Sequence, residues 1–170
     1  RTVIKNAPLA IKDPNNYNAR AELMMASSFG CCGLLNIGRE ASPWVCHGLE
    51  HELSAFYDIT HGVGLAILTP VWMKYSLNEK TARRFADYGR NVFGLDRNKG
   101  DLETAERAIS KTAEFFKSIG LPSRLSEVGI DATHFEEMAD HVLKIWFGDF
   151  SKAIRPLDKG DIIKILNNCL

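Results

Sequence analysis

The stretch that decides the fold runs from residue 45 to residue 62 and reads VCHGLEHELSAFYDITHG. It holds three of the five histidines of the chain, His47, His51 and His61. His47 and His51 lie four residues apart, so a helix presents both on one face, about one turn apart. His61 begins the next helix, after the short link 58–60, and a helix that folds back there meets the first two imidazoles. The stretch therefore predicts two facing helices with three histidines between them.

This histidine cluster has two interpretations. Imidazoles from facing helices are how helix bundles build metal sites, and neutral imidazole binds zinc and divalent iron alike. A lone histidine in an apolar helix, however, is usually a hydrogen-bonded core or surface residue, so structural histidines stay open as the alternative. A zincin-type hydrolase is disfavoured, because Ala55 stands where H-E-x-x-H needs its second histidine after His51-Glu52, and Gly48 follows His47.

Helical periodicity dominates the rest of the chain, and strand alternation is almost absent. We expect an all-α fold, with one multi-helix domain over residues 1–170. The local signals are Ser42 and Pro43 as N-cap and first helical residue, Asp101 as a cap, a bend at Pro70 and a stop at Gly94. The expected helices cover residues 1–11, 17–35, 43–57, 61–77, 80–93, 101–119, 131–146 and 158–166.

Composition excludes several classes of partner. The 170 residues are 45% hydrophobic and 25% charged, and 21 basic residues balance 21 acidic ones. This balance leaves no electrostatic footprint for nucleic acid or for an anionic membrane, and no run of 18 apolar residues could span a bilayer. The four cysteines form no C-x-x-C pair, which fits reduced thiols in a cytoplasmic protein. For Cys31 and Cys32, in an apolar helix, the expectation is a pair of buried, inert thiols.

With these motifs the chain resembles the iron-containing (group III) alcohol dehydrogenases, in particular their butanol dehydrogenase branch. The resemblance rests on HGLEHEL (47–53), DITHGVGLA (58–66), Pro70, ASSFG (26–30) and PLDKGDI (156–162). Motif order and spacing agree over essentially the whole chain, and the histidine segment is the specific part. The resemblance implies the helical C-terminal domain of a two-domain enzyme with a dehydroquinate synthase-like fold.

The resemblance also implies a role for each histidine. The family holds a divalent metal, usually iron and sometimes zinc, with one aspartate and three histidines, and two of those histidines match His47 and His61. The histidine that matches His51 lines the site near nicotinamide and substrate and is a candidate proton relay. In such a site the metal acts as a Lewis acid on the oxygen of a small alcohol or aldehyde, and NAD or NADP carries the hydride.

The chain departs from the family at the other two ligands. They form an Asp-x-x-x-His unit upstream in the family, and this spacing does not occur in these 170 residues. The N-terminal dinucleotide-binding domain is missing from this sequence as well. We therefore expect an inactive fragment of an NAD(P)-dependent alcohol dehydrogenase that holds its metal weakly or not at all, because two imidazoles bind a divalent ion less tightly than a complete ligand set. Exposed helix faces favour self-association into a homo-oligomer.

Overall fold

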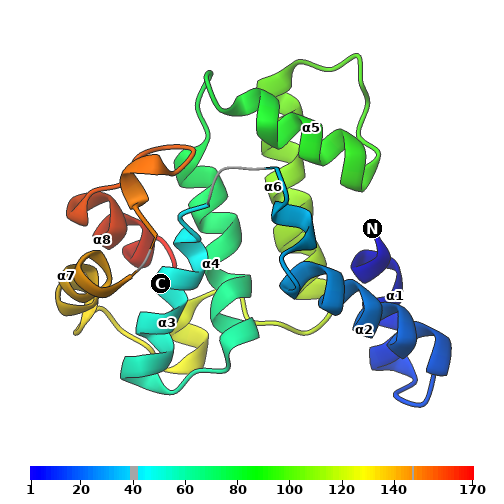
Figure 1. The fold of residues 1–170 in the computed structure, drawn as a ribbon, viewed down its shortest axis with the longest axis horizontal. Helices are drawn as coiled ribbons and strands as arrows, with labels where there is room; N and C mark the ends of the chain where they lie inside the picture. The colour runs from blue at the N-terminus through cyan, green and yellow to red at the C-terminus, as the bar shows by residue number, and fades with distance from the viewer. Residues whose placement is uncertain (39–41, 147) are drawn as a thin grey trace. The chain divides into compact units, whose positions relative to one another are not determined.

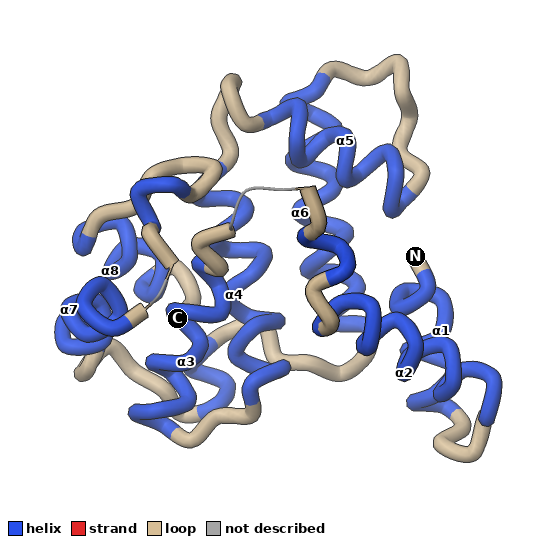
Figure 2. Tube along the Cα trace, in the orientation of Figure 1, coloured by secondary structure: helices blue, strands red, loops and turns tan. Residues whose placement is uncertain are grey.

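The computed structural model describes residues 1–38, 42–146 and 148–170. These residues form helices and loops, and no strand is found among them, so the predicted all-α class is confirmed (Figures 1 and 2). The chain divides into two compact units, residues 1–41 and 42–170. That residues 1–170 form a single domain stays a prediction. In the described ranges, no helix has both the length and the apolar character needed to cross a membrane.

The first unit is a helical hairpin of α1 (Thr2–Lys12) and α2 (Tyr17–Cys31), which contact each other. The Asn16 side chain caps α2 by accepting the backbone N–H of Ala19 at 3.0 Å. Helix α2 ends four residues before the predicted end, because Gly33 adopts a left-handed φ of 78° and a short 3-10 turn, η1 (Leu34–Asn36), follows.

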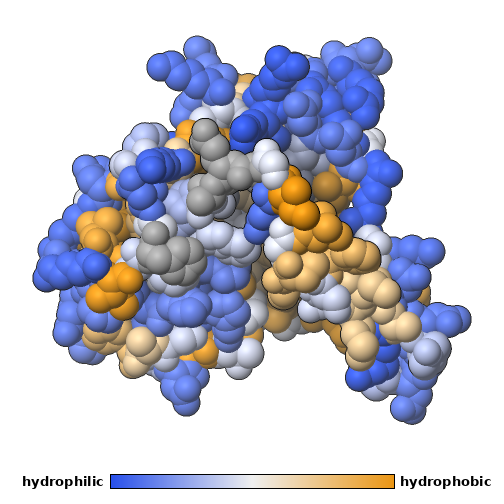
Figure 3. All heavy atoms as spheres, viewed as in Figure 1, coloured by the Kyte–Doolittle hydropathy of each residue, from blue (hydrophilic) through white to orange (hydrophobic). Residues whose placement is uncertain are grey.

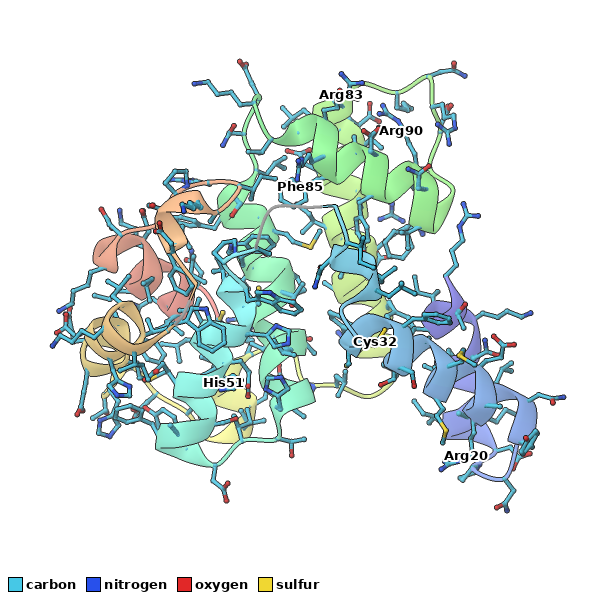
Figure 4. All side chains as sticks on the ribbon, in the orientation of Figure 1. Arg20, Cys32, His51, Arg83, Phe85 and Arg90 are labelled. Atoms are coloured by element: carbon cyan, nitrogen blue, oxygen red, sulfur yellow. The ribbon has the colours of Figure 1, made fainter. Side chains whose placement is uncertain are left out.

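Much apolar surface of this first unit is exposed. Figure 3 shows the hydrophobic colouring over this part of the chain. The exposed large side chains on α2 and η1 are Tyr17, Met24, Met25, Phe29, Leu34 and Leu35, followed by Ile37. The expectation that Cys31 and Cys32 are buried is wrong: both are exposed (Cys32 is labelled in Figure 4), since α2 buries only Ala19.

In the second unit, α3 (Val45–Tyr57) and α4 (His61–Ser76) lie side by side, α7 (Phe135–Ile145) packs on α3, and α8 (Lys159–Asn167) packs on α4 and α7. The largest fully buried apolar side chains of these helices form the main core: Leu49, Leu53, Ile67, Leu68, Phe135, Met138, Val142, Ile162, Ile165 and Leu166. Each such side chain stabilises the fold by about 1.5–3 kcal/mol. This core fixes the positions of α3 and α4.

Helices α5 (Ala82–Phe93) and α6 (Asp101–Ser118) pack on each other, and α6 also contacts α4. They enclose a second core of Met73, Phe85, Ala105 and Ile109. Close approach depends on Gly89, where an added Cβ would lie 2.7 Å from the Ala108 Cβ. The predicted stop at Gly94 is confirmed, because this residue ends α5 with a left-handed φ of 68°.

Two predictions about helix starts are wrong, and in each case the residue concerned makes a tertiary contact. Helix α3 begins at Val45 rather than Pro43, and the carbonyl of Pro43 accepts the indole N–H of Trp146 at 2.8 Å. Asp101 does not cap α6: its carboxylate pairs with Arg90 at 2.8 Å, and the N-cap is the preceding residue.

A third start, that of α7, is displaced by local backbone bonding. It was predicted at Asp131 but lies at Phe135. The Asp131 carboxylate accepts the backbone N–H of Thr133 at 2.9 Å, a turn that competes with helix. For α8 the prediction holds to one residue, with Asp158 as N-cap of a capping box.

Candidate metal centre

The turn between α3 and α4 folds one helix back against the other. Asp58 ends α3 in the left-handed conformation, with φ of 52°, and its backbone N–H bonds to the Ser54 carbonyl at 2.9 Å. The Ser54 hydroxyl lies 3.0 Å from the carbonyl oxygen of Ile59, inside the turn. Thr60 is the N-cap of α4, although its side chain makes no capping bond. The tightness of this turn places the start of α4 beside the middle of α3.

The structure brings the three predicted histidines together. The ring centroid of His61 lies 5.2 Å from that of His47 and 5.4 Å from that of His51. His51 is labelled on α3 in Figure 4. His47 is half-buried, whereas His51 and His61 are exposed. The three imidazoles therefore form one cluster on the open side of the α3–α4 pair.

Two tryptophans border this cluster. The ring of Trp44 meets that of His47 nearly at right angles, with centroids 4.8 Å apart. The ring of Trp146, at the end of α7, lies 5.2 Å from that of His51. Gly48 leaves room for Trp146, since an added Cβ would lie 3.1 Å from its Cε2 atom. The contact of Trp146 with the cluster was not predicted, because nothing in the sequence links residue 146 to the histidine segment.

The environment of His47 favours its neutral form. Burial lowers the pKa of His47, the neighbouring His61 and His51 lower it further, and Glu50 opposes them with a smaller effect. A neutral imidazole has a free lone pair, which is the form that binds a metal ion. The donor chemistry of the cluster therefore fits a divalent transition metal.

A carboxylate, Glu50, belongs to the same cluster. Glu50, His51 and His61 each offer a donor atom, and these atoms lie within 4.8 Å of one another. His47 is not a member of this set. Glu50 Oε2 contacts Nδ1 of His61 directly. The sequence alone assigns Glu50 no role, although positions 47, 50 and 54 form a stripe on one helical face that could have marked it.

The other histidines and thiols take no part in this cluster. His141 Nδ1 lies 2.9 Å from the buried carboxylate of Glu52, a pair that joins α7 to α3. His134 pairs with the exposed Glu137 at 3.4 Å. Burial raises the pKa of the Cys46 thiol to about 12, against a smaller opposing effect of its hydrogen bond with Thr69.

Comparison with known proteins gives the family. The model of the "Fe-containing alcohol dehydrogenase family, C-terminal" matches residues 1–170. The chain belongs to the iron-containing alcohol dehydrogenase family. It is 48% identical to NADH-dependent butanol dehydrogenase A of Clostridium acetobutylicum over 165 residues, which is 97% of this chain and 42% of that protein. It is 30% identical to 1,3-propanediol dehydrogenase of Klebsiella pneumoniae over 148 residues, or 85% of this chain and 36% of that protein.

Solved structures of iron-containing alcohol dehydrogenases agree with the fold. The crystal structure of NADH-dependent butanol dehydrogenase A from Thermotoga maritima superposes with a TM-score of 0.87 at 32% identity, over 99% of this chain and 43% of that one. The all-helical fold is therefore that of the family's C-terminal domain, as predicted. The chain spans about two fifths of the length of the relatives it matches.

Proposed function

We propose that this chain is the metal-binding helical domain of an NAD(P)-dependent iron-type alcohol dehydrogenase that interconverts small primary alcohols and aldehydes. The observation that carries the proposal is the convergence of His47, His51 and His61 from two facing helices. The names of its relatives support this reaction class, since they include NADH-dependent butanol dehydrogenases and a 1,3-propanediol dehydrogenase. The same kinship supports a whole protein that works in the cytoplasm.

His47 and His61 are the proposed metal ligands, with Fe²⁺ as the first choice and Zn²⁺ as the second. The lowered pKa of His47 supports this role, because it favours the neutral ring, whose lone pair can bind a metal ion. When bound, the ion supplies Lewis-acid polarisation of the substrate oxygen, and a nicotinamide held outside this chain exchanges the hydride. The remaining ligands are proposed to come from outside these 170 residues.

His51 is the proposed proton carrier. Its ring is exposed, lies next to that of His61 and is bordered by Trp146, so it can pass a proton between the substrate oxygen and water. Trp146 shields one side of this path, and we propose that it helps to limit the access of bulk water. The proposal gives the isolated chain no activity, since it supplies only part of the ligand set.

The proposal is tested by His47→Ala and His61→Ala in the intact enzyme that carries this chain, with His134→Ala as the matched control. We expect both substitutions in the cluster to remove bound iron and butanol oxidation, measured by metal analysis and nicotinamide absorbance. The control, whose side chain pairs with the exposed Glu137 and lies outside the cluster, keeps both. Metal and activity that survive the cluster substitutions refute the ligand assignment. Turnover by the 170-residue chain alone refutes its inactivity.

A non-catalytic domain with structural histidines is the alternative, and the contact between His61 and buried Glu50 favours it. This alternative predicts that His61→Ala lowers the unfolding temperature while metal content stays as it was. The same two variants therefore separate the two functions, because only the proposed ligand role couples both histidines to bound metal.

A further inference from the structure

Glu50 is a charged residue type in a fully buried position. Its side chain has 0% of its surface exposed, although it lies on α3 between the half-buried His47 and the exposed His51. An isolated buried carboxylate is very costly, so its oxygens must be paired by hydrogen-bond donors. The identity of those donors shows what the carboxylate does.

Each oxygen of Glu50 has a partner among the residues that the structure describes. Oε1 accepts the Ser54 hydroxyl at 2.7 Å, one helical turn further along α3. Oε2 contacts Nδ1 of His61 on α4. An ionised carboxylate only accepts hydrogen bonds, so with Glu50 in that form this contact places the proton of the imidazole on Nδ1. The lone pair of a neutral His61 ring is then on Nε2.

Helix α4 is shaped to admit this carboxylate. Gly64 lies one turn after His61, and an added Cβ there would lie 2.7 Å from Glu50 Cγ and 2.9 Å from Oε1. By contrast, a Cβ added at Gly62 in the same helix would meet no atom within 4 Å. The missing side chain at position 64 therefore provides the space in which Glu50 reaches His61.

We propose that Glu50 is a positioning residue, which holds His61 as the Nδ1–H tautomer with Nε2 directed to the metal. Metal-binding imidazoles typically donate their second N–H to a carboxylate or carbonyl, which fixes the ring and raises its basicity. We assign Glu50 to the orientation of His61 rather than to the metal, because its Oε2 contacts the imidazole of His61 directly. The claim that Nε2 is directed to a metal rests on the proposed function, whereas the claim about the tautomer of His61 does not.

The first test measures the tautomer without metal. Long-range ¹H–¹⁵N correlation spectra of the 170-residue chain, at about pH 8 where an ordinary imidazole is neutral, report which ring nitrogen carries the proton. We expect Nδ1–H for His61 in the wild type, loss of this preference in Glu50→Leu, and its retention in Glu50→Gln, whose amide oxygen can still accept. A wild-type His61 with Nε2–H, or an unchanged tautomer in Glu50→Leu, overturns the proposal.

Glu52→Leu is the matched control. It removes a second buried carboxylate from the same helix, but the histidine it contacts is His141. We expect it to change the tautomer of His141 and to leave that of His61 as in the wild type. If Glu52→Leu shifts His61 as much as Glu50→Leu does, the effect is a general loss of helix packing and the proposal fails.

The second test measures the dissociation constant of Zn²⁺ in the intact enzyme by competition with a chelator. We expect Glu50→Leu to weaken binding about 10- to 100-fold, Glu50→Gln to recover most of it, and Glu52→Leu to leave it unchanged. Zn²⁺ affinity that is equal in Glu50→Leu and the wild type overturns the positioning role. A wild-type enzyme that binds no metal overturns the proposed function, while the tautomer result still decides what Glu50 does to His61.

Discussion

The substitution Gly64→Ala tests how firmly Glu50 is fixed between α3 and α4. The added Cβ would lie 2.7 Å from Glu50 Cγ, 2.9 Å from Oε1 and 3.2 Å from Cδ. Glu50 cannot move away freely, because it is fully buried and both of its oxygens are bonded. Overpacking of this kind costs about 1–3 kcal/mol. Alanine also gains about 0.5–1 kcal/mol over glycine inside a helix, so the net loss of unfolding free energy is about 0–2.5 kcal/mol.

The matched control is Gly62→Ala in the same helix. The space at this position is open, and neither glycine is among the residues with positive φ, so alanine is compatible with both backbones. Gly62→Ala therefore gains the stability that alanine gives over glycine in a helix, without a steric clash with Glu50. The difference between the two variants therefore isolates the contact with Glu50, at about 1–3 kcal/mol. For a chain of this size that is about 2–12 °C in unfolding temperature.

Circular dichroism at rising temperature and in urea measures both variants of the 170-residue chain. We expect Gly62→Ala to unfold at a higher temperature than the wild type, and Gly64→Ala to unfold below Gly62→Ala by the stated margin. The double variant Glu50→Ala/Gly64→Ala should be more stable than the sum of its single changes predicts, by about 0.5–3 kcal/mol. Equal stabilisation by the two glycine substitutions would refute the reasoning, because it would mean that Glu50 is not held against α4.

Further predictions concern the thiols and the last helix. At about pH 8, two of the four thiols of the folded chain should react quickly with a disulfide reagent, those of the exposed Cys31 and Cys32. Cys46 and Cys169 should react only on unfolding, since burial raises the pKa of each thiol to about 12. If all four thiols of the folded chain react quickly, the burial of the Cys46 and Cys169 thiols is contradicted. Asp158→Ala should lower the unfolding free energy by about 0.5–2 kcal/mol, because the backbone N–H of Asp161, which the Asp158 carboxylate accepts at 2.8 Å, loses its partner. Unfolding in urea measures this loss.

The fold was predictable because helix type depends on local periodicity, which the sequence carries in full. Helix boundaries were less so, because they depend on contacts between distant segments. The beginning of α3 is one example: Ser42 and Pro43 give a good local start signal, but Trp146 bonds to the Pro43 carbonyl and Trp44 takes a left-handed φ of 52°. A non-glycine residue in that conformation is held by its surroundings, and a local signal cannot reveal it.

The candidate site was predictable where spacing alone sets the geometry. His47 and His51 share a face because they are four residues apart, and the short link before His61 requires α4 to turn back. The contact of Glu50 with His61 depends on how closely α4 approaches α3, which Gly64 determines. The sequence shows that glycine but not what fills the space beside it. Its partner could be identified only after the helices were placed.

The two faces of α3 have separate tasks, and this bears on how the chain holds a metal. Leu49 and Leu53 are buried in the main core, whereas His51 is exposed on the side of the cluster. Apolar packing, rather than a bound ion, therefore positions the helices, in contrast to small zinc domains that fold only with their metal. Glu50 then sets the orientation of His61 within that scaffold. The weak metal binding that we expect from the isolated chain follows from the number of ligands it supplies, because two imidazoles bind a divalent ion less tightly than a complete ligand set.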